Sequence, residues 1–154
     1  MYETFIEARE EIKRADHLIF VSLKYTRTVD VIKSIIERFI NAYELSINAL
    51  LKKLETEGKI EEIPASVFAK VELVRKIFPE DLTLSNDLTF YLSLRIISRA
   101  KFTKAREFRR HVTMTAELPD GTLKELTIDT INEDFIKTKE FIEKIKNYLY
   151  PPVP

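Results

Sequence analysis

Basic and aromatic residues gather in one segment of the chain, between residues 95 and 111, and their types suggest contact with phosphate. The segment contains these side chains: Arg95, Arg99, Lys101, Phe102, Lys104, Arg106, Phe108, Arg109, Arg110 and His111. Arginine can bind phosphate through two N–H groups, lysine attracts it as a point charge, and an aromatic ring can stack on a base. We therefore predict a phosphate or RNA contact, with these residues binding nucleic acid: Arg99, Lys101, Lys104, Arg109 and Arg110.

Two residues of this segment, Arg106 and His111, are separated by four others and have the chemistry to cleave RNA. A histidine changes its protonation near neutral pH and can act as a general acid or base, while an arginine holds the phosphate. The 2′-hydroxyl of RNA would serve as the nucleophile, so no metal is required. Arg106 and His111 are therefore the candidate catalytic pair.

The same basic segment also fits a plain solvated surface. The chain has 25 Lys and Arg residues against 25 Asp and Glu residues, so its net charge is zero. No global field therefore attracts nucleic acid or anionic lipid, and charge runs of this kind usually face solvent. Any binding of phosphate must be local to the segment.

Several classes of active site are excluded by composition. Cysteine is absent, which removes disulfides, thiolate catalysis and Cys-based zinc sites. The two glycines, Gly58 and Gly121, are too few for a phosphate-binding glycine-rich loop. His17 and His111 are too few for a His-rich metal site. We therefore expect neither a metal nor another cofactor.

The length of 154 residues suits one domain, which we place at residues 1–150, with a Pro-rich tail at 151–154. The first eleven residues lack the layout of a secretory signal, and no stretch approaches the roughly 20 apolar residues that span a bilayer. A cytoplasmic protein without membrane contact is expected. Glutamine is absent and Lys, Glu and Ile are abundant, a bias that suits a thermophile.

Helical periodicity covers most of the chain. Apolar residues recur at helical spacing in five stretches, which predict helices over Thr4 to about Lys24, about Val29 to Glu57, Ala65 to Ile77, about Asp87 to Phe102, and Ile131 to Leu149. The second of these helices has a very broad apolar surface. Such a surface predicts either a central helix or one that also faces a partner subunit.

Capping residues mark the ends of several predicted helices. Thr28 offers an N-cap for the second helix and Gly58 a C-cap. Ser85 or Asn86 would cap the fourth helix. A capping box formed by Thr130 and Glu133 would begin the last helix.

From Arg106 onward the pattern changes to the alternation of a β-strand, which predicts a strand that continues to Leu118. A tight turn at Pro119–Thr122 and a returning strand over Leu123 to Ile128 complete a hairpin at 106–128. The fold class is therefore mainly α: a helical bundle of about five helices with one C-terminal antiparallel β-hairpin before the last helix. Residues five apart in a strand point to opposite faces, so a strand beginning before Arg106 would separate it from His111.

The spacing of Arg106 and His111 resembles the Arg-x(4 to 6)-His motif of HEPN domains. The helices from Thr4 to Phe102, above all the long one containing Asn41-Ala42-Tyr43-Glu44, also look like the HEPN bundle, so the resemblance covers about two thirds of the chain. HEPN domains are helical bundles that often form dimers, and their active members are metal-independent ribonucleases. The resemblance implies a homodimer that binds RNA or nucleotide and uses Arg106 and His111 for catalysis. Members without the motif act as nucleotide-binding or toxin–antitoxin partners.

A second hypothesis belongs to another functional class: a non-catalytic homodimeric interaction or scaffold domain. Its interface would consist of the helix over residues 29–57 and the hairpin, because the broad apolar surface of that helix could cover a second copy. RNA cleavage in the presence of EDTA would distinguish the first hypothesis, and sizing by light scattering the second.

Overall fold

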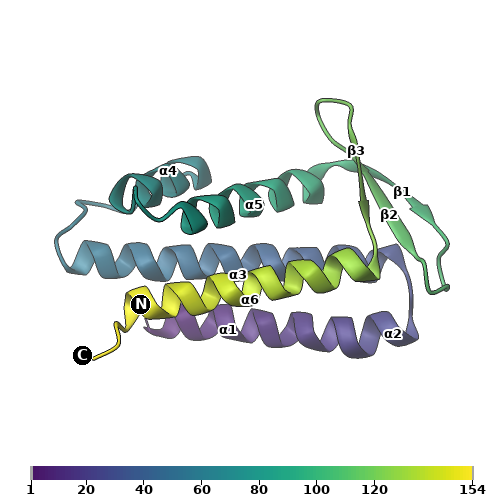
Figure 1. Cartoon of the computed structure of the whole chain (residues 1–154), viewed down its shortest axis with the longest axis horizontal. Coiled ribbons are helices and arrows are strands. Elements are labelled where there is room, and N and C mark those ends of the chain that lie inside the picture. The colour runs from purple at the N-terminus through teal and green to yellow at the C-terminus, as the bar shows by residue number, and fades with distance from the viewer. Residues whose placement is uncertain (1, 154) are drawn as a thin grey trace.

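The computed structural model describes residues 2–153 and shows a bundle of helices with a small sheet at one end (Figure 1). The helices are α1 (Tyr2–His17), a π-helical segment η1 (Leu18–Ser22), the single turn α2 (Leu23–Tyr25), α3 (Val29–Thr56), α4 (Val67–Ile77), α5 (Leu82–Arg99) and α6 (Ile128–Leu149). Three strands lie between α5 and α6 in the chain. The predicted mainly α class is confirmed.

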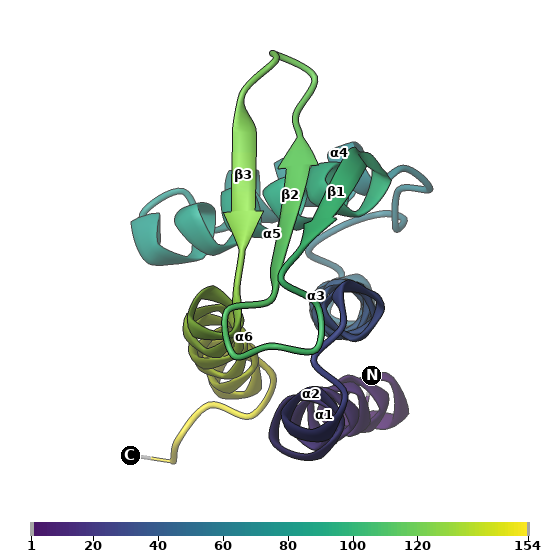
Figure 2. The same ribbon diagram turned by 90° about the vertical axis from the view of Figure 1, so that its right-hand side faces the viewer.

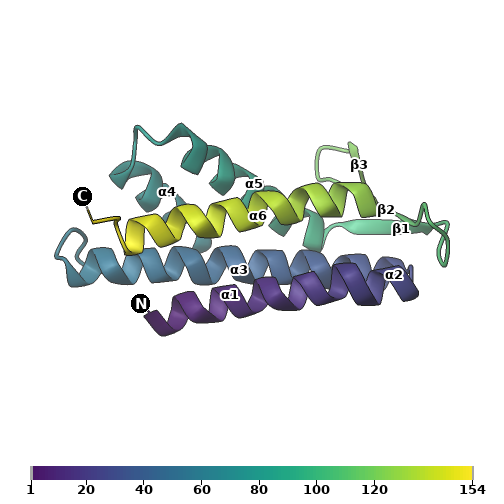
Figure 3. The same cartoon turned by 60° about the horizontal axis from the view of Figure 1, so that its bottom comes forward.

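The longest helix, α3, is the axis on which the others pack, with α1 and α6 running along it (Figure 3). Thr28 begins it as predicted, because its Oγ1 accepts a hydrogen bond from the Val31 N–H at 3.4 Å. Gly58 follows its end with a φ of +73°, a conformation that glycine adopts without strain. The N–H of Lys59 then returns to the carbonyl oxygen of Leu54, which closes the helix.

The broad apolar surface of α3 is covered by the chain's own helices. Fourteen of its residues are buried, among them Ile32, Ile36 and Phe39 with no exposed surface. At its centre the ring of Tyr43 stacks on those of Tyr91 from α5 and Phe141 from α6. Of the two interpretations of this surface, the structure therefore supports the central helix, and a dimer would have to use another face.

The first predicted helix extends from Tyr2 to Tyr25 and contains a π-helical segment that periodicity did not predict. A π-helical turn accommodates one extra residue and shifts the faces of the residues after it. In η1, Ile19 is buried whereas Phe20 and Val21 are exposed. Such bulges often occur at functional sites.

The boundaries predicted for the fourth helix were wrong at both ends. Helix α5 begins at Leu82, and its N-cap is Asp81, whose Oδ1 accepts from the Leu84 N–H at 2.9 Å. Residues 82–86, which the prediction placed before the helix, therefore belong to it, and neither Ser85 nor Asn86 is its cap. At the other end α5 stops at Arg99, and Phe102 lies in a strand.

The sheet has three antiparallel strands in the order β1 (Lys101–Ala105), β2 (Thr113–Glu117) and β3 (Leu123–Leu126). The predicted turn at Pro119–Thr122 does connect β2 to β3. Strand β1 was not predicted, because only Phe102 among its five residues is a large apolar side chain. The predicted strand also began too early, since residues 106–112 form a loop.

Helix α6 begins with a different capping box from the one predicted. Thr127 is the N-cap: its Oγ1 accepts from the Thr130 N–H, and the Thr130 Oγ1 accepts from the Thr127 N–H. Glu133 takes no part in this box. The buried positions of the helix agree with the predicted stripe, which includes Phe135 and Phe141.

Candidate functional site

The loop of residues 106–112, between β1 and β2, lies at the end of the bundle away from the two chain termini (Figure 1). Figure 2 looks onto this end and shows the loop lying between the starts of α3 and α6. Its four basic side chains, Arg106, Arg109, Arg110 and His111, are all exposed. The arginines take part in none of the ion pairs between described residues.

Two hydrogen bonds hold the loop against the junction between α2 and α3. The carboxylate of Glu107 accepts from the backbone N–H of Val29 at 3.1 Å, so its negative charge lies at the positive N-terminus of α3. The N–H of Phe108 donates to the carbonyl oxygen of Arg27 at 2.6 Å. Val112 is completely buried at the end of the loop. The basic side chains therefore extend from a loop that is fixed at both ends and in the middle.

Two residues of the loop have the left-handed backbone conformation, Arg106 with a φ of 57° and Phe108 with a φ of 64°. Side chains with a Cβ atom disfavour this region by about 1–2 kcal/mol. The conformation directs the chain back on itself and leaves the ring of Phe108 75% exposed. An exposed aromatic ring thus lies in the same loop as three unpaired arginines.

A pocket of about 250 Å³ opens beside the loop. It is lined by Arg27, Arg110, His111, Thr127, Ile128 and Asp129. The capping box of α6 uses the N–H groups of Thr127 and Thr130, which leaves those of Ile128 and Asp129 without a partner inside the helix. Two guanidinium groups, an imidazole and a helix N-terminus therefore meet at this pocket, and all four can donate hydrogen bonds to an anion. The carboxylate of Asp129 opposes them.

Arg27 occupies the inner side of this pocket. Its Nε atom is buried and has no hydrogen-bond partner among the described residues. The sequence does not single out this residue, because it stands alone in the short break between two helices and about 80 positions before the loop of residues 106–112. Only its hydrogen bond to the Phe108 N–H and the position of α6 bring it to the loop.

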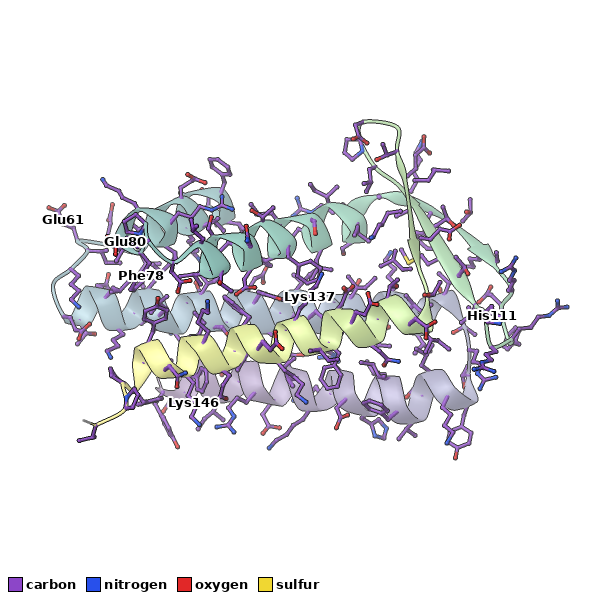
Figure 4. All side chains as sticks on the ribbon, in the orientation of Figure 1. Glu61, Phe78, Glu80, His111, Lys137 and Lys146 are labelled. Carbon is purple, nitrogen blue, oxygen red and sulfur yellow. The ribbon has the colours of Figure 1, made fainter. Side chains whose placement is uncertain are left out.

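The two candidate catalytic residues, Arg106 and His111, lie in the same loop, but only His111 lines the pocket. His111 lines the pocket and lies at the end of the molecule away from the chain termini (Figure 4). Arg106 is not among the six lining residues, whereas Arg110 is. Residues 106–112 form a loop. The alternation of a strand, which would place Arg106 and His111 on opposite faces, is therefore absent here.

The remaining predicted nucleic-acid contacts are distributed over a larger area. Lys104 pairs with Asp30 at 3.2 Å, and Lys101 faces Glu117 across the sheet. Arg99 lines a separate pocket of about 210 Å³ on α3 and α5. The basic segment is therefore continuous in the chain but divides into several surfaces, of which the loop is the most concentrated.

A second cluster of polar side chains lines a smaller pocket of about 120 Å³ between α3, α4 and α5. Here the polar groups are partnered. Glu44 accepts from the hydroxyl of Tyr91 at 3.1 Å and from Arg95 at 2.6 Å, and Lys70 donates to Asn48 at 2.9 Å. Burial and the charge of Glu44 raise the pKa of Tyr91 above its ordinary value, which keeps the hydroxyl neutral. This cluster serves the packing of the helices.

Residues 2–153 contain no group of three or more histidine, aspartate or glutamate side chains that could hold a metal ion. None of the helices described is long and apolar enough to cross a membrane. Comparison with known proteins identified no relative: no family model, no curated protein and no solved structure matches this chain.

Proposed function

We propose that this protein binds RNA, or a nucleotide, through phosphate at the loop of residues 106–112. The observation that carries the proposal is the pocket lined by Arg27, Arg110, His111 and the first turn of α6. A phosphate there would accept charge-assisted hydrogen bonds from the guanidinium groups and ordinary ones from backbone N–H groups. Oxyanions such as phosphate accept from both kinds of donor at once.

The exposed ring of Phe108 adds a second type of contact. Stacking of a base on an aromatic side chain contributes about 1–3 kcal/mol per base and tolerates any sequence. The ring lies in the same loop as Arg109 and Arg110, so phosphate and base of a single strand can be bound together. This combination favours single-stranded RNA, whose bases are open for stacking.

The HEPN resemblance extends the proposal to cleavage of RNA by Arg106 and His111. A neutral His111 would take the proton of the 2′-hydroxyl while its oxygen attacks phosphorus, and the 5′-oxygen would leave with a proton from an acid. The products are a 2′,3′-cyclic phosphate and a 5′-hydroxyl. Because one imidazole cannot take and give a proton in the same step, the second group would be His111 of another copy. With His111 of a second copy as the acid, the proposed catalysis involves a homodimer, and the same ribonuclease would suit a toxin–antitoxin component.

Binding and cleavage can be tested separately. Fluorescence anisotropy with a labelled single-stranded RNA measures binding of the protein and of Arg110→Ala, with Arg9→Ala on α1 as the matched control. A cleavage assay with EDTA compares the protein with His111→Ala and Arg106→Ala. We expect Arg110→Ala to weaken binding and both other variants to abolish cleavage. Equal cleavage by all three proteins would mean a contaminating nuclease.

An additional variant tests the electrostatic part of the proposal. Asp129 is the one carboxylate in the lining, so Asp129→Asn removes a repulsion and should strengthen phosphate binding severalfold. An unchanged affinity would place the phosphate elsewhere on the molecule.

The alternative is a non-catalytic homodimeric interaction or scaffold domain. It is supported by exposed apolar side chains on η1 and α6: Phe20 and Ile136 are each 57% exposed and line one hollow between these helices. Contiguous exposed apolar surface commonly marks an interface. A dimer in light scattering that lacks both RNA binding and cleavage would support this alternative.

A further inference from the structure

A second pocket lies next to the phosphate pocket, along the first turns of α6. It has a volume of about 220 Å³ and is lined by Ile19, Phe20, Leu23, Lys24, Arg27, Ile128 and Asn132. Arg27 and Ile128 line both pockets, so the two hollows adjoin. Together they reach the range of about 300–1,000 Å³ that is typical of small-ligand sites.

Two polar atoms of this second pocket are buried without a partner among the described residues. They are the Nε atom of Arg27, a donor, and the Oδ1 atom of Asn132, an acceptor. Only three such side-chain atoms occur in residues 2–153, and two of them belong to this one lining. A buried polar group without a hydrogen bond destabilises the native state, so such groups are rare and require an explanation. Both atoms are covered by the protein itself, so a ligand that supplies an acceptor beside a donor would satisfy them once the two side chains turn toward the pocket.

The rest of the lining is apolar and includes an exposed ring. Ile19, Leu23 and Ile128 provide aliphatic surface, and Phe20 is 57% exposed although it belongs to the most apolar part of the first helix. The π-helical segment η1 holds Phe20 in this position, close to the ring of Phe135 at 6.0 Å between centroids. A flat ligand could therefore pack on Phe20 while its edge faces Arg27 and Asn132.

The geometry points to a nucleobase in this second pocket, joined to a phosphate in the first. A nucleobase is flat, presents a hydrogen-bond donor beside an acceptor on its edge, and in a nucleotide is attached through ribose to phosphate. Arg27 lines both pockets, so it would contact both parts of such a ligand. This inference rests on the proposed function and adds a base-binding position to it, so that the protein binds a nucleotide rather than phosphate alone.

Isothermal titration of the full chain with four compounds tests the inference. The compounds are adenosine and uridine 5′-monophosphate, ribose 5-phosphate and inorganic phosphate. We expect at least one of the two nucleotides to bind about tenfold tighter than ribose 5-phosphate, which corresponds to about 1.4 kcal/mol from the base. Equal affinity for the nucleotides and ribose 5-phosphate would overturn the base pocket and leave the proposed phosphate binding intact.

Variants of the lining distinguish a base pocket from a general loss of folding. Asn132→Leu keeps the size of the side chain and removes the polar edge, so it should lower nucleotide affinity severalfold without changing the affinity for ribose 5-phosphate. Because the variant removes an unpartnered acceptor, its melting temperature should not fall. Phe20→Ala should also weaken only the nucleotides. Phe68 on α4 is 67% exposed and provides the control, because Phe68→Ala should have no effect.

The remaining outcomes are decisive as well. Unchanged nucleotide affinity in both Asn132→Leu and Phe20→Ala would refute the base pocket. RNA binding without binding of any of the four compounds would refute it too, while RNA binding itself would stand. If neither RNA nor any of these compounds binds, both the base pocket and the proposed function are wrong.

Discussion

Polar side chains cluster at both ends of the helical bundle, but they are hydrogen-bonded to one another at one end and lack partners among residues 2–153 at the other. Near the chain termini, Asp81 accepts from the Leu84 N–H at 2.9 Å, from Lys144 at 3.1 Å and from the hydroxyl of Tyr148. Each oxygen of the carboxylate has a partner. The cluster joins the start of α5 to the last turns of α6.

At the opposite end, the loop of residues 106–112 and the start of α6 contain cations without partners. Arg110 forms no ion pair among the described residues, and the Nε of Arg27 is buried without a hydrogen bond. Polar groups that satisfy one another stabilise the fold, whereas groups that remain unsatisfied are available to a ligand. The comparison therefore separates a structural cluster from a candidate binding site within one small protein.

The largest effect on stability is expected at Asp81. Asp81→Ala removes the N-cap of α5 and the partners of Lys144 and Tyr148, so the free energy of unfolding should fall by about 2–3 kcal/mol. Urea denaturation at pH 7 measures the change. The exposed neighbour Glu80 (Figure 4) provides the control, because Glu80→Ala should change stability by less than about 0.5 kcal/mol. Similar losses in the two variants would contradict the comparison.

The same carboxylate predicts a pH dependence. Burial alone would raise the pKa of Asp81, but the hydrogen bonds from Tyr148, the Leu84 N–H and Lys144 lower it below its ordinary value of 3.8. A carboxyl group with a lowered pKa in the folded state stabilises the protein above its unfolded pKa, and this stabilisation is lost as pH falls through the folded pKa. The difference in stability between the protein and Asp81→Ala should therefore shrink below about pH 4.

At the binding end the largest effect should be on affinity and not on folding. Arg110→Ala is expected to weaken RNA binding about tenfold at low salt, or about 1.4 kcal/mol, and to leave urea stability nearly unchanged. Removing one phosphate contact should also lower the slope of log affinity against log salt by about 0.7 for a single strand. Anisotropy titrations at several salt concentrations measure both. A large loss of stability instead would mean that Arg110 is structural, like Asp81.

Asp134 on α6 is also a partly buried carboxylate, but within the described residues it lacks the side-chain and backbone hydrogen bonds that offset the burial of Asp81. Burial raises its pKa from 3.8 to about 6, although the charges of Lys137 and Lys124 act against this shift. Since the raised pKa disfavours the charged form in the folded state, the cost is absent below pH 3.8 and complete above pH 6. Asp134→Asn should therefore stabilise the protein by about 1 kcal/mol at pH 7, after allowance for partial exposure, and by nothing at pH 3.5. Thermal denaturation at the two pH values checks the sign.

A small gain in stability is expected at Phe108. Phe108→Gly relieves the left-handed backbone strain but adds freedom to the unfolded chain, so stability should rise by about 0.5 kcal/mol. RNA affinity should fall severalfold, because the stacking ring is lost. Phe108→Ala loses the ring but keeps the strain, so it should lower affinity equally without the gain in stability. Unchanged RNA affinity in both variants would exclude the ring from the interface.

Prediction from sequence succeeded where local physics decides the outcome. The apolar periodicity located α3 to within one residue, and the cap at Thr28 and the left-handed Gly58 marked its ends. It failed at β1, where a strand of mostly polar residues is held by pairing with β2 rather than by its own pattern. It failed also at Asp81, which caps α5 while it binds side chains on α6 more than sixty positions away.

The residues of the candidate site also fall into two groups, those that the sequence indicates and those that only the structure reveals. Arg110 and His111 are visible in the sequence because a run of basic residues is a local feature. Arg27 and Asn132 are not, because a single arginine or asparagine becomes notable only when folding buries it without a partner. The sequence by itself thus determined the helices, the hairpin turn and the basic segment. Only the tertiary structure decided which cations meet at the start of α6, since that meeting depends on contacts between segments about 80 to 100 positions apart.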